Sequence, residues 1–372
     1  DQLRALLLWQ PMEQLRIKLT HLSQDYHALN STNTSSFPDR REKEHQILPS
    51  PVTSEFVLDS LEGSWDFESS RVVSLTSYTT KDASVASDAT ATLIGPPPAG
   101  YPRALTAFLA FDDNSKAFAQ EVRWQSTGDG DFQWLAGAYY FDYSVYFLIV
   151  GDLLSKQNAL GNGGLVDSLL NGVNIDLNLL NTLNNKTSLI YALSQPSAQE
   201  RALFFDLSDK FFDKLEVSVG ARVYSTLVEG GFFGTGVLAI GSNNGQDVHY
   251  ENNSIKENGV SPKFTATWHF DRDRSLYLQA ARGFRFGGLQ SVPSTPISKV
   301  PQVYKSDSLW NYEVGFRSRW LERTLQADLT AFKIDFKNPQ INQATQGLPL
   351  NYVDNVGSAE SIGLESSLRW LT

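Results

Sequence analysis

Residues suited to catalysis or metal binding are scarce in this chain of 372 residues. It contains no cysteine, which excludes a disulfide scaffold and a thiolate metal site. Its five histidines are His21, His27, His45, His249 and His269. His21 and His27 lie six positions apart, too far for one strand face to bring both onto a single metal ion. The sequence therefore predicts no metal site, and we interpret the histidines as side chains in contact with water.

Three further patterns suggest chemistry but lack the residues that the chemistry requires. The glycine-rich segments 161–164 and 230–236 have no Lys-Ser/Thr pair and no following helix, so neither is predicted to bind phosphate. Asp129 and Asp131 flank a glycine, but the other ligands of a calcium loop are absent. Serine is abundant and His269 is available, yet no nucleophile elbow is present. We expect no cofactor and no catalytic residue.

Ligand binding is the chemistry that the sequence favours. Tyr101, Phe232 and Phe233 are aromatic residues in long irregular segments, and Arg285 and Phe286 follow the end of an alternating segment. Small-molecule sites are concave, largely apolar and often built on loops. An arginine there could attract an anionic ligand. These five residues are the predicted ligand contacts.

Composition limits the class of protein. The chain is 41% hydrophobic and 19% charged, and its net charge of −10 argues against a nucleic-acid partner. No apolar run approaches the roughly 20 residues of a membrane helix. Residues 3–9 are apolar but lack the basic leader and cleavage site of a signal peptide. Residues 368–372 still alternate, so we expect a fragment of a longer protein.

The strand-like segments are joined asymmetrically. Short turns are predicted at 10–13, 67–70, 127–131, 211–214, 271–274 and 321–324. Long irregular stretches are predicted near 28–53, 82–115, 147–196, 227–256, 286–304 and 338–351. Short turns on one side and long loops on the other are typical of outer-membrane barrels.

The segments themselves alternate with period two, as half-polar strands do. In Asn311–Trp320, Val314 and Phe316 share one face, whereas Glu313 and Arg317 share the other. About thirteen strands are predicted, at Leu3–Gln10, Gln14–Tyr26, Phe56–Trp65, Arg71–Thr80, Ala117–Gln125, Phe132–Tyr143, Glu200–Leu207, Glu216–Tyr224, Lys263–His269, Leu276–Gly283, Asn311–Trp320, Gln326–Phe336 and Glu360–Trp370.

Charge decides which face meets lipid. An arginine at mid-bilayer costs about 2–4 kcal/mol, more than one cross-strand pair contributes. The polar faces, including Arg222, are therefore predicted to line a wet lumen. Aromatic residues near strand ends fit a girdle at the membrane interface, although ordinary strand propensity produces the same enrichment. The girdle residues are Trp134, Tyr139, Tyr140, Phe141, Trp310, Tyr312 and Trp320. A soluble barrel with an apolar centre would show the same alternation.

Several segments resemble TonB-dependent outer-membrane receptors. Residues 275–288 are similar to the family's "YAxxxKGFRPGG" strand and loop, with Phe286 in place of the usual proline and Ala281-Arg282 in place of Ser-Lys. Residues 307–315 are similar to "ExxxxYEVGxK" and residues 352–365 to "YxNxGxAxxxGxE". The segments 132–141 and 215–224 are similar to its middle strands. The resemblance extends from about residue 120 to the end.

The resemblance implies an all-β protein, with residues 1–372 forming the middle part of an outer-membrane antiparallel β-barrel as an incomplete barrel of about 13 strands. The plug domain, which engages a TonB-type energy-coupling protein, and the closing strands would be absent. The implied function is energised uptake of a scarce nutrient across the outer membrane, with a ferric siderophore as the expected cargo and outer-membrane lipid as surroundings. A passive porin or adhesin barrel and a soluble all-β binding protein remain alternatives.

Overall fold

The computed structural model describes residues 1–29, 50–88, 107–153, 190–236, 243–244, 246–290, 294, 299–344 and 351–370. Their main element is a thirteen-stranded antiparallel sheet in which strands pair in chain order. Its strands are β1 (Gln2–Met12), β2 (Leu15–Ala28), β3 (Val52–Asp66), β4 (Ser70–Asp88), β5 (Ala107–Ser126), β6 (Gln133–Leu153), β7 (Ile190–Phe211), β8 (Leu215–Thr235), β9 (Val248–His269), β10 (Arg274–Arg285), β13 (Asp307–Trp320), β14 (Leu325–Lys337) and β17 (Ser358–Trp370). The predicted number of strands and their antiparallel pairing are confirmed.

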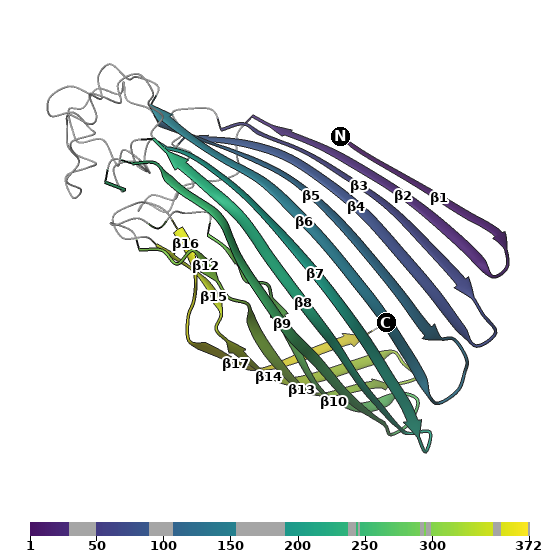
Figure 1. Ribbon diagram of the computed structural model, residues 1–372. Helices are drawn as coiled ribbons and strands as arrows, with labels where there is room; N and C mark the ends of the chain where they lie inside the picture. The colour runs from purple at the N-terminus through teal and green to yellow at the C-terminus, as the bar shows by residue number, and fades with distance from the viewer. Residues whose placement is uncertain are drawn as a thin grey trace.

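The sheet curls into an open trough rather than a closed barrel (Figure 1). β1 and β17 each pair with one neighbour only, so the sheet has two free edges in the described part of the chain. Two small hairpins lie in the long connections at one end of the trough: β11 (Gly288–Leu289) with β12 (Val303–Tyr304), and β15 (Gln340–Ala344) with β16 (Asn351–Asn355). Among the described residues no helix is long and apolar enough to span a membrane.

All six predicted short turns are confirmed, and they lie together at the opposite end of the trough (Figure 1). At the turn between β7 and β8, Phe212 and Asp213 have φ of 54° and 57°. Two successive residues with positive φ are typical of the tight turn that matches the twist of a hairpin. In the next turn the Arg274 side chain donates to the Asp271 carboxylate and lowers the pKa of Asp271 below its ordinary value.

Several predicted strands were too short at the long-loop end. β4 continues to Asp88, β6 to Leu153 and β8 to Thr235, while β5 begins at Ala107 and β7 at Ile190. The antiparallel ladder is continuous through β5 and β6 up to Ala107 and Leu153. The sequence alternation fades there because both faces carry the same kind of side chain, mostly polar at the end of β4 and apolar in Val145–Val150 of β6, so the period of two is lost.

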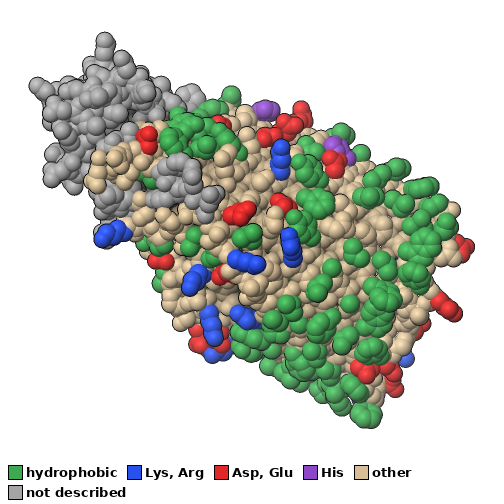
Figure 2. Space-filling view, viewed as in Figure 1, with side chains coloured by type: hydrophobic (Ala, Val, Ile, Leu, Met, Phe, Trp, Pro, Cys, Tyr) green, Lys and Arg blue, Asp and Glu red, His purple; other side chains and the backbone are tan. Residues whose placement is uncertain are grey.

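The outward face of the sheet carries an apolar band beside the short turns. Because facing residues in the ladder share a side, one set contains Leu203, Val223 and Val260, and another contains Leu278 and Val314. Leu203 is 68% exposed and Leu364 is 69% exposed. Figure 2 shows these hydrophobic side chains gathered over the turn end of the sheet. The predicted direction of the apolar face is confirmed.

Tryptophans mark the turn-side border of this apolar band. Seven of the eight tryptophans lie on the outward face at the turn end of the sheet. Each is next to a short turn, or it pairs with a residue that is next to one. They are Trp9, Trp65, Trp124, Trp134, Trp268, Trp320 and Trp370. Trp310 and Tyr312 lie on the same face at its other border. Two predicted girdle residues, Tyr139 and Phe141, face inward instead, because they share the side of Arg222 rather than that of Leu203.

A polar belt bounds the band on the long-loop side. It includes an ion pair between His21 Nδ1 and Asp59 Oδ1 at 2.7 Å, and one between Lys333 Nζ and Glu360 Oε2 at 2.8 Å. Along β9 the distance from Asn258 in the belt to Trp268 is ten residue steps, or about 33 Å of strand. With the tilt of about 40° usual in such barrels, the band is about 25 Å tall, the height of a membrane-facing band.

The side chains of β10 allow a direct test of which face of the sheet meets lipid. Leu278 points outward at the middle of the band, while Gln279 points inward opposite Glu313. In the full-length protein folded into a bilayer, we expect Leu278→Arg to lower the free energy of unfolding by about 2–4 kcal/mol. Gln279→Arg should be nearly neutral because the new cation lies beside a carboxylate. Urea titration followed by gel mobility of the unheated protein measures both, and equal losses would contradict the assignment of faces.

Candidate functional site

The inward face carries paired charges and aromatic rings on β6, β7 and β8. Arg222 donates to Glu200 Oε1 through Nη2 at 2.6 Å and Nε at 3.0 Å, and the Glu200 side chain is only 8% exposed. The Arg222 guanidinium also lies 4.7 Å from the ring centroid of Tyr139 and 5.9 Å from that of Phe204. Tyr139 is on β6 and Arg222 is on β8, so the contact reaches across β7. Such a contact is possible because side chains on a concave face converge. Arg222 is thus held by a partner rather than merely solvated.

An aromatic stack follows where β9 and β10 separate. Pairing between these strands stops at Lys263 and Ala281. Beyond that point Tyr224 and Phe284 stack in parallel with ring centroids 3.6 Å apart. The Tyr224 ring covers Gly259, where a Cβ atom would approach its hydroxyl oxygen to 2.3 Å. A glycine at this position therefore leaves the space that the tyrosine ring occupies.

Arg285 belongs to a polar network at the long-loop end. Its Nε donates to both carboxylate oxygens of Asp307, at 2.9 and 3.1 Å, and its Nη2 also donates to Asp307. The Asp307 side chain is 1% exposed, and it also accepts from the backbone N–H of Gln340 at 3.0 Å. Gln340 in turn donates through Nε2 to the carbonyls of Phe286 and Lys305. We call Arg285, Asp307 and Gln340 the loop clamp, because they join the ends of β10 and β13 to β15.

Further hydrogen bonds connect the two small hairpins to each other and to the sheet. Asn355 donates to the carbonyls of Lys305 and Asn338 at 2.9 and 3.0 Å. Gln290 exchanges hydrogen bonds with the backbone of Val353. Tyr304 of β12 pairs with Gly288 of β11, and burial raises the pKa of its hydroxyl above the ordinary value. Within the described residues, side-chain hydrogen bonds to backbone carbonyls and N–H groups therefore tie the two small hairpins to each other and to the ends of the sheet strands.

The predicted ligand contacts do not form one cluster. Arg285 is in the loop clamp, although its side chain remains 55% exposed. The ring centroid of Phe286 lies 5.7 Å from that of Phe284. Phe232 is buried on the inward face with Ala192 and Val248 near the long-loop end. Phe233 alternates to the outward face, where its ring meets Tyr191 at 6.3 Å. Tyr101 lies outside the described residues.

Sequence reasoning missed Glu200, Asp307 and Gln340, the partners that hold the arginines. No local pattern separates these residues from solvated loop or lumen side chains, since their contacts join positions far apart in the chain. Glu200 carries one signal in hindsight, as it begins a predicted strand facing the one that contains Arg222. Within the described ranges, no group of three or more His, Cys, Asp or Glu residues is placed to hold a metal ion. The inward face offers aromatic surface and paired charges, which suit binding.

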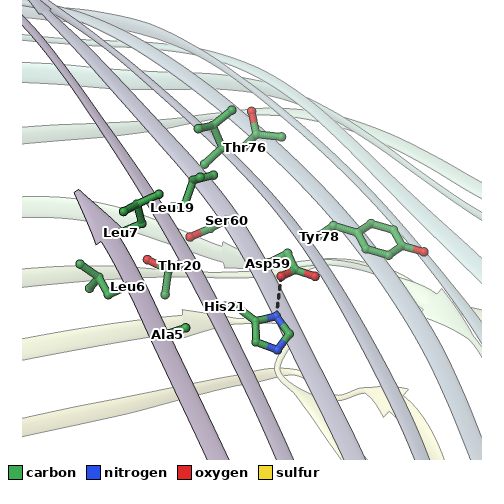
Figure 3. Close-up of a pocket in the computed structure, with 11 residues that line it drawn as sticks. Ala5, Leu6, Leu7, Leu19, Thr20, His21, Asp59, Ser60, Thr76 and Tyr78 are labelled. Atoms are coloured by element: carbon green, nitrogen blue, oxygen red, sulfur yellow. Dashed lines mark hydrogen bonds and ion pairs between the residues drawn. The ribbon is translucent and has the colours of Figure 1, made fainter. Parts of the chain in front are cut away.

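A shallow depression of about 520 Å³ lies on the other side of the sheet, over β1 to β4. Figure 3 shows Leu7 and Leu19 at one side of it and the His21–Asp59 pair at the other. It therefore straddles the border between the apolar band and the polar belt. None of the predicted ligand contacts lines it.

Comparisons with known proteins identify the architecture. Residues 20–372 match the family described as TonB dependent receptor-like, beta-barrel. The ferric yersiniabactin uptake receptor FyuA from Yersinia pestis has a similar structure, with TM-score 0.72 and 14% identity, over 99% of this chain and 48% of that one. The ferric-catecholate import receptor Fiu from E. coli K12 gives 0.65 and 13%, over 99% and 54%. The siderophore receptor PiuA from Acinetobacter baumannii gives 0.65 and 12%, over 99% and 53%. The chain thus spans about half the length of each.

The loop clamp makes a prediction about order at the long-loop end. In the full-length protein, Arg285→Ala leaves the buried Asp307 carboxylate without its cation, which costs about 1.5–3 kcal/mol locally. We expect amide hydrogen exchange in 339–344 and 351–355 to become about ten-fold faster or more. Arg282→Ala on the same strand is the control, because the hydrogen bonds of Arg282 to described residues are two long ones of 3.3 and 3.4 Å. Unchanged exchange in the Arg285 variant would show that the clamp does not order the hairpins.

Proposed function

The chain belongs to the TonB-dependent receptor-like β-barrel family, and from that premise we propose that its parent protein is an outer-membrane receptor for energised uptake of a ferric siderophore. The family match over residues 20–372 is the observation that carries this proposal. The fold agrees with it, since an outward apolar band and a polar inward face are what a lipid-embedded, water-lined wall requires.

We further propose that residues 1–372 form the middle part of the barrel. The chain covers 48% to 54% of the three receptors compared above, and among the described residues β1 and β17 each pair with one strand only. Unpaired backbone groups cannot face lipid, so other strands of the full-length protein would close the barrel. Charged inward side chains such as Lys18, Glu62 and Arg317 would then face a plug domain that engages the TonB-type protein.

The cargo is inferred from the side chains at the long-loop end of the trough and from the solved structures that the chain resembles. FyuA and Fiu are described as receptors for ferric compounds, and PiuA as a siderophore receptor. In this chain the long-loop end offers aromatic rings, among them Phe284 and Phe286, beside the half-exposed Arg285. A large anionic iron chelate with aromatic or apolar parts fits such a surface, because it supplies both a negative charge and area to bury.

The exposed apolar face argues against a soluble protein but does not separate a receptor from a porin or an adhesin. A soluble all-β protein would bury its apolar face, but Val223 and Leu368 are 53% and 73% exposed on the outward face. A passive porin or adhesin barrel has the same wall, and only energy coupling separates it from a receptor. The family comprises transport receptors rather than enzymes, and we propose no catalytic role.

Uptake in whole cells tests the function. A host deprived of its own siderophore receptors and expressing the full-length protein should accumulate radioactive iron from at least one class of ferric siderophore. Accumulation should fall to background when the TonB-type protein is deleted or a protonophore is added, because transport against a gradient needs energy.

Passive diffusion of small sugars, measured by liposome swelling, separates the alternatives. Swelling without energy-dependent iron uptake would identify a porin instead. A host that shows neither, despite correct insertion of the protein, would contradict iron transport and leave another nutrient as the cargo.

A further inference from the structure

Two cations stand together on the outward face, directly above the apolar band. The ladder places Arg201 of β7, Ser225 of β8 and Asn258 of β9 side by side, and Lys256 lies two residues before Asn258 on the same face of β9, opposite Leu227. Arg201 and Lys256 are exposed, and neither forms an ion pair within the described part of the chain. We call these four residues the cationic patch. It offers two positive charges and two neutral hydrogen-bonding side chains.

An apolar stripe runs from the patch toward the short turns. The first row below it is Leu203, Val223 and Val260, and a later row is Leu207, Val219 and Phe264. All six side chains are exposed, by 42% to 68%. Patch and stripe are thus continuous on the same three strands, with charge at the border of the band and hydrocarbon within it (Figure 2).

The nearest acids do not neutralise the patch. Asp142 on β6 is held by two donors of its own, Tyr140 Oη at 3.0 Å and Gln199 Nε2 at 2.9 Å. Glu229 on β8 lies opposite Ser254 and diagonally next to Lys256, which faces Leu227, but within the described residues it forms no ion pair with Lys256. The positive charge of Arg201 and Lys256 therefore remains available to an outside partner.

We propose that this patch and stripe form a binding site for a phosphate-bearing membrane lipid, whose headgroup contacts Arg201 and Lys256 and whose acyl chains lie along Leu203, Val223 and Val260. The charges at the border of the band complement a phosphate, and Ser225 and Asn258 can donate to its oxygens. The apolar stripe selects a lipid over a soluble phosphate, since a soluble anion gains nothing from it. The site faces away from the lumen, so it is separate from cargo binding.

Lipid retention by the purified full-length protein tests the site. The protein in neutral detergent is titrated with phosphatidylglycerol or with zwitterionic phosphatidylcholine, and bound lipid is counted by native mass spectrometry. We expect phosphatidylglycerol to bind in preference, and binding to weaken about thirty-fold in the double variant R201Q/K256Q. The charge-conserving variant R201K/K256R should retain it.

The matched control removes two cations from the inward face. Lys263 and Arg319 are exposed there, so K263Q/R319Q changes net charge equally without touching the patch. Binding should be unchanged in this variant and in the presence of inorganic phosphate at the lipid concentration. Full binding by R201Q/K256Q, an equal loss in the control, or equal binding of both lipids would overturn the proposal. Energy-dependent iron uptake is read separately, so its failure leaves this result intact.

Discussion

The antiparallel ladder is the constraint on which the other features depend. Every strand of the thirteen-stranded sheet except the edge strands β1 and β17 pairs with neighbours on both sides, although β9 and β10 pair only from Lys263 and Ala281 to the short turn. Pairing gives backbone groups the partners that they need where the wall meets lipid. The ladder also determines which way side chains point. A one-residue slip in β13 would exchange Val314 and Phe316 for Glu313 and Arg317 on the outward face. Because hydrocarbon penalises that exchange strongly, the register of each strand follows from its charges.

This explains how much of the fold the sequence could predict. Within the band one face must be apolar and the other wet, so segments such as Asn311–Trp320 show the alternation and were placed correctly. Above the band both faces meet water, and the alternation disappears. Residues 112–115 (Asp-Asp-Asn-Ser) belong to a predicted irregular stretch, yet they pair in register with β4. Pro196 would ordinarily break a strand, but it lies opposite Gly230 inside β7.

The candidate site was less predictable, for a different physical reason. The predicted ligand contacts are aromatic or cationic side chains in or beside long connections, and the type of a residue does not reveal its partner. Asp307 and Gln340 lie 22 and 55 positions from Arg285. Only the ladder and the two small hairpins bring them together. Phe232 and Phe233 are adjacent in sequence but belong to opposite faces of β8, so at most one of them can face a ligand in the lumen.

The length of the strands carries the sheet beyond the membrane at the long-loop end of the trough. β5 to β8 contain 20 to 22 residues, about twice the 9–11 needed to cross a bilayer. The excess extends beyond the polar belt on the long-loop side, where Phe232, Ala192 and Val248 pack against Leu109 and Ile149 on the inward face. This packing stiffens a collar of sheet outside the membrane. Because the collar keeps the ends of β5 to β8 paired at the long-loop end, a ligand that bound against it would meet strands that are already ordered, which lowers the entropy cost of binding. The same strands thus present an apolar outward face to lipid at one height and a packed inward face at another, and the change between them occurs at the polar belt.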